Sequence, residues 1–229
     1  MICNLYVFRH AETTDNRNGI FSGWRDPDLT SKGLMQAQEI AEQLEKEKID
    51  YAFTSHLLRA KKTLEIVLKP HHNVPVFVDD RLIERCYGML QGKSKVEIET
   101  EKPEWFAKVH RGYDFAPPKG ESLKMVESRI LPFVFQLEMG LKLKSGNVAI
   151  SCHGNSLRPI RRFFEHLSLK QMLQLENPQN QAMQYALQIH RIKVNHIEEG
   201  KPETGWHGVV VPSSVKLATD PKNPLRQYY

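Results

Sequence analysis

Short apolar runs and longer amphipathic stripes alternate along this chain. The runs have the length and content of buried strands. They lie at residues 5–8, 51–54, 74–78, 147–152 and 183–190. Between most of them, apolar residues recur every three or four positions, as they do on one face of a helix. Strands that alternate with helices predict an α/β fold, here a three-layer α/β/α sandwich around a mainly parallel central sheet.

The stripes predict helices at residues 31–48, 57–69, 122–143 and 155–167. Thr30 precedes the first helix and has a side chain suited to an N-cap. Pro132 lies inside the third helix and is expected to kink it or split it into two. Pro75 places its strand near an edge of the sheet, because proline cannot donate to a strand ladder. Residues 79–120 are predicted to be rich in loops.

The chain changes in character near its C-terminal end. From Glu198 onward it is rich in proline and glycine and has one apolar island at residues 209–211. We therefore predict one domain over residues 1–195 and a tail over residues 196–229. A partly ordered surface segment is the preferred interpretation of the tail; a lid, an extra edge strand and a partner contact are the alternatives.

Composition limits the class of protein. The chain has 229 residues, of which 40% are hydrophobic and 26% charged, which fits one globular domain with a full core or two small ones. No apolar run approaches the roughly 20 residues of a membrane span, and the first residues do not resemble a signal peptide. We expect a cytoplasmic protein that does not bind membranes. Its three cysteines are scattered without metal-ligand spacing and are expected to be reduced thiols.

The formal charge of +5 and the isoelectric point of about 9.0 allow two interpretations. A basic balance is typical of nucleic-acid binding, but the cations here are spread along the chain without interleaved aromatic residues. A basic pocket for a small polyanion explains the same charge. We expect the pocket, and no nucleic-acid partner.

Two histidines follow predicted strands. His10 comes directly after residues 5–9, beside Arg9, and His153 comes directly after residues 147–152. Ligands of α/β proteins bind at the carboxyl ends of the strands, so the two rings face one pocket if their strands are neighbours. Neutral imidazole can attack phosphorus, and a guanidinium can neutralise the phosphoryl oxygens. A lone histidine at such a place is more often a surface residue or a satisfied core residue.

Two further charged residues lie at similar junctions. Arg59 is on the first turn of the helix after residues 51–54, where a guanidinium can clamp a phosphate with two hydrogen bonds. Glu84 lies in a loop, and a carboxyl group can give a proton to a leaving alkoxide and later recover it. Taken singly, Arg59 is more often a solvated helix residue and Glu84 with Arg85 a surface ion pair.

Taken together, these motifs resemble those of the histidine phosphatase superfamily, and within it the cofactor-dependent phosphoglycerate mutases. The resemblance extends over about residues 3–190. It is carried by residues 9–13 with Asn16, 21–24, 28–30, 53–63, 84–95, 121–123 and 153–158.

The resemblance implies a role for each matching residue. His10 would be the phosphorylated nucleophile and Glu84 the proton donor and acceptor. Arg9, Arg59 and His153 would bind the transferring phosphoryl group. The remaining matches would line the substrate pocket: Thr13, Asn16, Ser22, Gly23, Arg85, Tyr87, Lys95, Arg111 and Asn155.

The resemblance also implies a glycolytic and gluconeogenic reaction, the interconversion of 3-phosphoglycerate and 2-phosphoglycerate. The enzyme would need no metal, and 2,3-bisphosphoglycerate would prime it by phosphorylating the histidine. Relatives are commonly dimers or tetramers, so a homodimer or homotetramer is implied.

The chain departs from the mutase pattern at three places. Ala11 replaces the usual glycine, His110 stands where many mutases have arginine, and the segment before Gly120 is short. A more open pocket admits water, so a histidine phosphatase that hydrolyses a small phosphomonoester is the alternative. A non-catalytic phosphate-binding module is a third hypothesis, which the presence of Glu84 and His153 disfavours.

Overall fold

The computed structural model describes residues 2–198 and 201–216, and side chains for residues 2–110 and 112–189. Within these residues the strands form one six-stranded sheet of order β3-β2-β4-β1-β5-β6. Their bounds are β1 Ile2–Arg9, β2 Tyr51–Thr54, β3 Val76–Val78, β4 Val148–Cys152, β5 Ala182–Glu198 and β6 Lys201–Lys216. The first four strands pair in parallel, and β5 and β6 are antiparallel to their neighbours. The predicted mainly parallel core of the sheet is confirmed, as is the edge position of β3.

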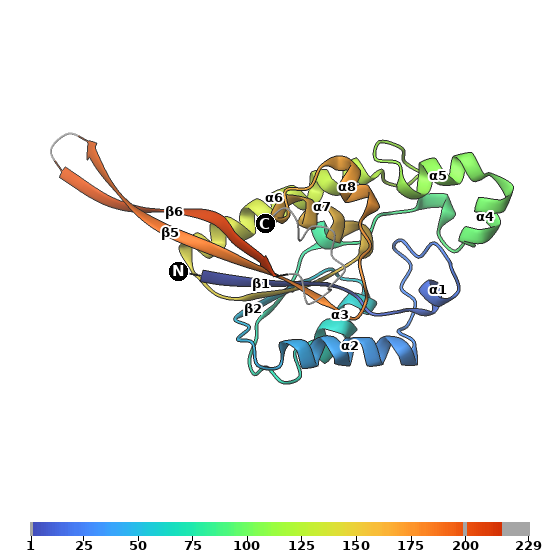
Figure 1. Cartoon of the computed structure of the whole chain (residues 1–229), viewed down its shortest axis with the longest axis horizontal. Helices are drawn as coiled ribbons and strands as arrows, with labels where there is room; N and C mark the ends of the chain where they lie inside the picture. Colours follow the sequence, from blue (N-terminus) through green and yellow to red (C-terminus); the bar gives the residue numbers. More distant parts are fainter. Residues whose placement is uncertain (1, 199–200, 217–229) are drawn as a thin grey trace.

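Helices cover both faces of the sheet (Figure 1). On one face lie α2 (Ser31–Leu44) and α3 (Leu58–Val67), and on the other lie α6 (Leu123–Leu143) and α7 (Gly154–Phe164). Successive side chains of a strand point to opposite faces. Tyr6 and Phe8 accordingly pack with residues of α2 and α3, whereas Leu5 and Val7 pack with residues of α6 and α7. This arrangement confirms the predicted three-layer sandwich.

The start of α2 is held against the loop that follows β1. Thr30 is its N-cap, and the Thr30 hydroxyl accepts a hydrogen bond from Gly33 N at 2.9 Å. A Cβ on Gly33 would come within 2.1 Å of the carbonyl oxygen of Glu12, so only glycine permits this approach. Helix α2 therefore supports the backbone two residues beyond His10.

The helices differ from the prediction in two details. Helix α6 is not split at Pro132, because the buried residues Ile130, Phe133 and Val134 hold it on the sheet on both sides of the proline. That packing outweighs a local cost of about 3 kcal/mol. Helix α7 ends at Phe164 rather than near residue 167, and a further helix that the sequence did not indicate, α8 (Leu169–Gln174), follows it.

The stretch at residues 79–120 is less loop-rich than predicted. It contains two short 3₁₀ helices, η1 (Asp80–Leu82) and η2 (Gly88–Leu90), and the helices α4 (Lys95–Glu101) and α5 (Pro103–Arg111). A separate core cluster explains them, since Phe106 and Val109 of α5 pack against Phe21. Short helices of this kind depend on such tertiary packing more than on local propensity.

The C-terminal tail also differs from the preferred interpretation. Residues 201–216 form β6, an edge strand paired with β5, so the alternative of an extra edge strand holds for them. The predicted domain boundary at residue 195 falls inside β5, and residues 217–229 lie outside the described residues. Of the helices in the described part of the chain, none has the length and apolar character required to cross a membrane.

Candidate active site

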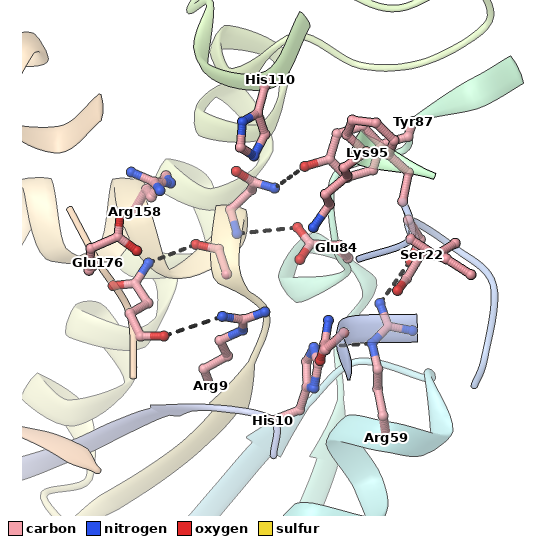
Figure 2. A pocket seen from close by; sticks show the side chains of 17 residues that line it. Arg9, His10, Ser22, Arg59, Glu84, Tyr87, Lys95, His110, Arg158 and Glu176 are labelled. Carbon is pink, nitrogen blue, oxygen red and sulfur yellow. Dashed lines mark hydrogen bonds between the residues drawn. The ribbon is translucent and has the colours of Figure 1, made fainter. Parts of the chain in front are cut away.

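A cavity of about 210 Å³ opens where β1 and β4 end (Figure 2). These strands are parallel neighbours, with Arg9 opposite Cys152 in register. The residues that follow, His10 and His153, therefore lie side by side, with ring centroids 5.1 Å apart. The strand-end histidines meet in space as the sequence predicted. The cavity has the volume of about seven water molecules, which suits a small polar ligand.

His10 is held in one tautomer. Its Nδ1 lies 2.8 Å from the carbonyl oxygen of Ala11, which can only accept a hydrogen bond, so Nδ1 carries the proton. Its Nε2 accepts a hydrogen bond from Arg59 Nε at 3.2 Å, so the Nε2 lone pair is present. Burial, followed by the charges of Arg59 and Arg9, lowers the pKa of His10 well below its usual value. The imidazole is therefore neutral at neutral pH, with its unprotonated nitrogen beside a guanidinium.

Arg59 lies on the first turn of α3 and is 1% exposed. Beyond its contact with His10, Arg59 Nη1 donates to the carbonyl of Arg25 at 2.6 Å and Nη2 to the carbonyl of Gly23 at 2.7 Å. The guanidinium is thus fixed between His10 and the loop at residues 22–26. It provides a preorganised positive charge at His10.

Arg9 has an unsatisfied donor in the same cavity. Its Nη1 donates to the carbonyl of Asn177 at 3.3 Å, but its buried Nε has no hydrogen-bond partner among the described residues. The buried hydroxyl of Ser22, also on the cavity wall, has none either. Buried polar groups are rarely left unpaired in native proteins. Two such groups in one cavity fit a ligand with several acceptor oxygens.

Glu84 completes the reactive group. One of its oxygens, Oε1, accepts hydrogen bonds from Arg85 N at 2.7 Å and from Asn155 N at 3.2 Å. The Glu84 carbonyl is held by Trp24 Nε1 at 2.8 Å and by Arg129 Nη2 at 3.1 Å. The carboxylate is therefore oriented from both its side-chain and its backbone ends.

His153 is fully buried behind His10 and is not part of the cavity wall. Its Nε2 lies 2.7 Å from the hydroxyl of Ser55, and its buried Nδ1 has no hydrogen-bond partner among the described residues. The Ser55 oxygen also accepts a hydrogen bond from Leu57 N at 3.3 Å, so the hydroxyl is held at the base of the His153 ring.

Three groups, His10, Glu84 and His153, each bring one nitrogen or oxygen atom within 4.8 Å of the others. This geometry is compatible with a metal ion, but its electrostatics favour an anion. The Nε2 lone pair of His10 already accepts from Arg59. Burial, followed by the charges of Arg59 and Arg9, lowers the pKa of both imidazoles. The same field that opposes a proton on these rings opposes a metal cation.

Most of the predicted pocket residues line the cavity. They are Arg9, His10, Asn16, Ser22, Gly23, Arg59, Glu84, Tyr87, Lys95 and Asn155. Figure 2 shows Tyr87 and Lys95 on the wall opposite Arg9. The amide of Asn155 donates to the Tyr87 hydroxyl at 3.0 Å, and burial lowers the pKa of Lys95.

Three of the predicted residues do not line the cavity, which corrects the prediction for them: His153, described above, Thr13 and Arg85. Thr13 is fully buried as the N-cap of α1 (Thr14–Arg17), where its hydroxyl accepts from Asn16 N. Arg85 is fully buried and donates to the carbonyls of Val109, His110, Phe115 and Glu121. It anchors the chain at residues 109–121 rather than facing the cavity. The side chain of Arg111 lies outside the described residues.

The sequence interpretation missed part of the wall. Arg158, Glu176, Asn177 and Gly154 line the cavity, and so does His110, which had been noted only as a departure. Arg158 lies three residues after Asn155 on α7, and this spacing places both on one helix face. That signal was available in the sequence. Glu176 and Asn177 lie in a loop, where no periodicity points to them.

Comparison with known proteins gives a consistent result. A family model described as the histidine phosphatase superfamily (branch 1) matches residues 5–197. The 2,3-bisphosphoglycerate-dependent phosphoglycerate mutase of Nitrobacter winogradskyi is 38% identical over 177 residues, which are 75% of this chain and 86% of that protein.

Solved structures add two kinds of relative. A mycobacterial glucosyl-3-phosphoglycerate phosphatase matches with a TM-score of 0.72 at 25% identity, over 82% of this chain and 91% of that chain. The phosphoglycerate mutase of Bacillus anthracis matches with a TM-score of 0.69 at 21% identity, over 81% of this chain and 88% of that chain. The second likeness confirms the predicted mutase-like fold. The chain is thus similar to both mutases and phosphatases.

Proposed function

Since the chain belongs to the histidine phosphatase superfamily, we propose that it is a phosphoglycerate mutase that acts through a phosphohistidine at His10. The observation that carries the proposal is the neutral His10 ring, whose Nε2 lone pair lies beside Arg59 in a cavity that Glu84 also lines. The relatives at 38% identity that are named as mutases favour this reaction over hydrolysis.

The first half-reaction transfers a phosphoryl group to the enzyme. His10 Nε2 attacks the phosphorus, a nitrogen–phosphorus bond forms, and the bond from phosphorus to the departing oxygen breaks. The departing oxygen takes a proton from Glu84, which must hold one at this stage. Arg9 Nε, Arg59 and the Ser22 hydroxyl are the donors on the cavity wall for the three phosphoryl oxygens, whose charge persists throughout the transfer, and His153 supports the site from behind the wall.

The second half-reaction reverses the roles. An acceptor hydroxyl group attacks phosphorus, the nitrogen–phosphorus bond breaks, and the hydroxyl proton passes to Glu84. In a mutase the acceptor is the free hydroxyl of a phosphoglycerate, and the product is 2,3-bisphosphoglycerate, whose other phosphoryl group returns to His10 in the next transfer; in a phosphatase the acceptor is water. The two reactions therefore share every residue of the reactive group and differ only in what reaches the phosphohistidine.

A glycerate substrate carries a carboxylate besides its phosphate, and the far wall of the cavity offers groups for it. Lys95 and Arg158 are cationic, and the Asn155 amide lies between Tyr87 and Glu84. With Arg9 and Arg59 they make four positive charges on the wall, against the two negative charges of Glu84 and Glu176. The cavity is therefore cationic overall, as a doubly or triply charged substrate requires.

The same residues fit the proposed primer, 2,3-bisphosphoglycerate. The unpaired Arg9 Nε and Ser22 hydroxyl would bind one phosphate beside His10, and Lys95 and Arg158 would bind the other. When bound, the primer would supply the phosphoryl group that His10 receives before the first turnover. The proposal needs no metal.

A coupled assay tests the proposal. Conversion of 3-phosphoglycerate to 2-phosphoglycerate is coupled to enolase, and the absorbance of the phosphoenolpyruvate formed is measured with and without 2,3-bisphosphoglycerate. We expect turnover that rises steeply with added primer. Absence of turnover under both conditions, together with rapid release of free phosphate from phosphomonoesters, would refute the mutase assignment.

A histidine phosphatase remains the second candidate, and Glu176 favours it. This carboxylate lies on the cavity wall and acts on Arg9 electrostatically, so it opposes a second anionic group at that place. The likeness to a glucosyl-3-phosphoglycerate phosphatase at 25% identity points the same way. Free phosphate measured in the coupled assay separates the two candidate functions. A mutase releases little free phosphate per turnover, whereas a phosphatase releases one phosphate ion per turnover.

A further inference from the structure

One buried loop residue connects the two segments that carry the histidines. Asn177 lies between α8 and β5 and is 7% exposed. Its backbone carbonyl oxygen accepts a hydrogen bond from Arg9 Nη1 at 3.3 Å, and its side-chain Nδ2 donates to the backbone carbonyl of Gly154 at 2.9 Å. Asn177 therefore contacts both the residue before His10 and the residue after His153.

The orientation of Asn177 is fixed from the side away from the cavity. Arg161 Nη1 donates to Asn177 Oδ1 at 3.1 Å and to the carbonyl of Glu176 at 3.1 Å. A guanidinium only donates, so Oδ1 faces Arg161 and Nδ2 faces the carbonyl of Gly154. Each polar atom of the amide thus has a partner of the matching kind.

Arg161 is itself held by a buried network that the proposed chemistry does not use. Its Nε and Nη2 bind the two oxygens of Glu165 at 2.8 and 3.1 Å, and the Tyr185 hydroxyl donates to Glu165 at 2.7 Å. Burial, followed by the charge of Glu165, raises the pKa of Tyr185, so its proton stays in place. A buried ion pair with its hydrogen bonds satisfied is costly to break. A rigid connection therefore runs from β5 through α7 to Asn177.

The Arg9 guanidinium is held at one end. Its Nη1 donates to the backbone carbonyl of Asn177, and its Nε lies beside the start of α7, where a Cβ on Gly154 would be at an ordinary contact distance of 3.5 Å. The Nε that remains without a partner is the atom proposed to bind the phosphoryl group. We propose that Asn177 is a positioning residue that aims Arg9 Nε at the transferring phosphoryl group. The inference relies on the proposed function only in that Arg9 binds phosphate.

A double-mutant cycle tests whether Asn177 acts through Arg9. Calorimetry measures inorganic phosphate binding to the wild type, Asn177→Ala, Arg9→Ala and the double variant. Alanine retains the backbone carbonyl that accepts from Arg9 but removes the side-chain contacts to Gly154 and Arg161 that fix the position of this carbonyl. We therefore expect Asn177→Ala to weaken binding about tenfold, which corresponds to about 1.4 kcal/mol. In the Arg9→Ala background the same substitution should change binding less than twofold, because effects of coupled residues do not add.

Asn180→Ala is the matched control. It removes an asparagine from the same loop whose Nδ2 donates to Glu39 at 2.8 Å, outside the cavity. Phosphate binding by this variant should equal that of the wild type. Asn177→Ser, which retains a small polar side chain, replaces Asn177→Ala in the cycle if the alanine variant does not fold.

The titration of His10 gives a second readout. Arg59 from α3, Arg9 from β1, Glu84 from its loop and the His153 ring after β4 all face His10. If Arg9 turns away in Asn177→Ala, the pKa of His10 measured by NMR should rise, because the Arg9 charge lowers it. A purely structural role would leave it unchanged.

The outcomes separate this inference from the proposed function. Additive losses in the cycle, or equal binding by Asn177→Ala and the wild type, overturn the role of Asn177 and leave the phosphate site intact. A wild-type protein that binds no phosphate overturns the proposed function and this inference with it.

Discussion

Removing the guanidinium of Arg59 directly perturbs His10, the proposed nucleophile. Arg59 Nε contacts His10 Nε2 at 3.2 Å, and the side chain is 1% exposed. Loss of one preorganised donor to a developing oxyanion costs about 2.7–4 kcal/mol, so we expect Arg59→Ala to lower kcat by about 10²–10³-fold. The two hydrogen bonds to the carbonyls of Gly23 and Arg25 are lost as well. At about 1.5 kcal/mol each, stability should fall by up to roughly 3 kcal/mol.

The pH profile separates charge from packing. Only neutral His10 is nucleophilic, and the Arg59 charge is the largest cause after burial that lowers the pKa of His10. Without it the pKa rises, so the acid limb of the kcat/KM profile should move to higher pH in Arg59→Ala. Arg59→Lys retains the charge but loses the fixed fork of donors. It should lose rate while its acid limb stays close to that of the wild type.

The assay is steady-state turnover of a phosphomonoester between pH 4.5 and 8, with thermal unfolding of each variant as the control for folding. A wild-type kcat in Arg59→Ala would place Arg59 outside the chemistry. An unchanged acid limb in Arg59→Ala, with kcat reduced, would refute the argument that its charge keeps His10 neutral.

Three further predictions concern other parts of the site. Glu84→Gln should slow turnover far more than it slows formation of phospho-His10 from a donor with a good leaving group, such as p-nitrophenyl phosphate. Rapid-quench labelling measures the second rate, and equal slowing of both would exclude the proton-transfer role of Glu84. Both buried histidines have a pKa well below 6.5 in the folded protein, so the unfolded chain binds more protons below that pH. Stability measured with urea should therefore fall as pH decreases from about 6.5, by up to about 1.4 kcal/mol per pH unit for each histidine, and the slope should be smaller in His153→Phe. Arg85→Met should lower the melting temperature by several degrees with little effect on the dissociation constant of phosphate. A large increase in that dissociation constant would indicate that Arg85 belongs to the binding pocket.

The sequence predicted the sheet and the reactive residues because both are encoded locally. Buried strands are short apolar runs, and His10 and His153 directly follow two of them. Neighbouring parallel strands then bring the two rings together without any further signal. Glu84 and Arg59 were found through motifs at junctions of the same kind.

The sequence could not distinguish a charged residue that faces the cavity from one that supports it. Arg85 and Lys95 belong to the same motif, yet Arg85 is buried against four backbone carbonyls and Lys95 lines the cavity. Which carbonyls approach Arg85 depends on the path of residues 109–121, which no local pattern specifies. Asn177 was missed for the same reason, since its contacts reach back to Arg9 and Gly154.

The most direct test of the account is the identity of the phosphorylated atom. The protein is mixed with ³²P-labelled 2,3-bisphosphoglycerate, quenched within milliseconds, digested and analysed by mass spectrometry under alkaline conditions, with His10→Ala as the control. The account predicts one acid-labile phosphoryl group on Nε2 of His10, formed and lost at rates compatible with turnover, and no label in His10→Ala. Turnover without any label on His10, or label that persists in His10→Ala, would contradict it.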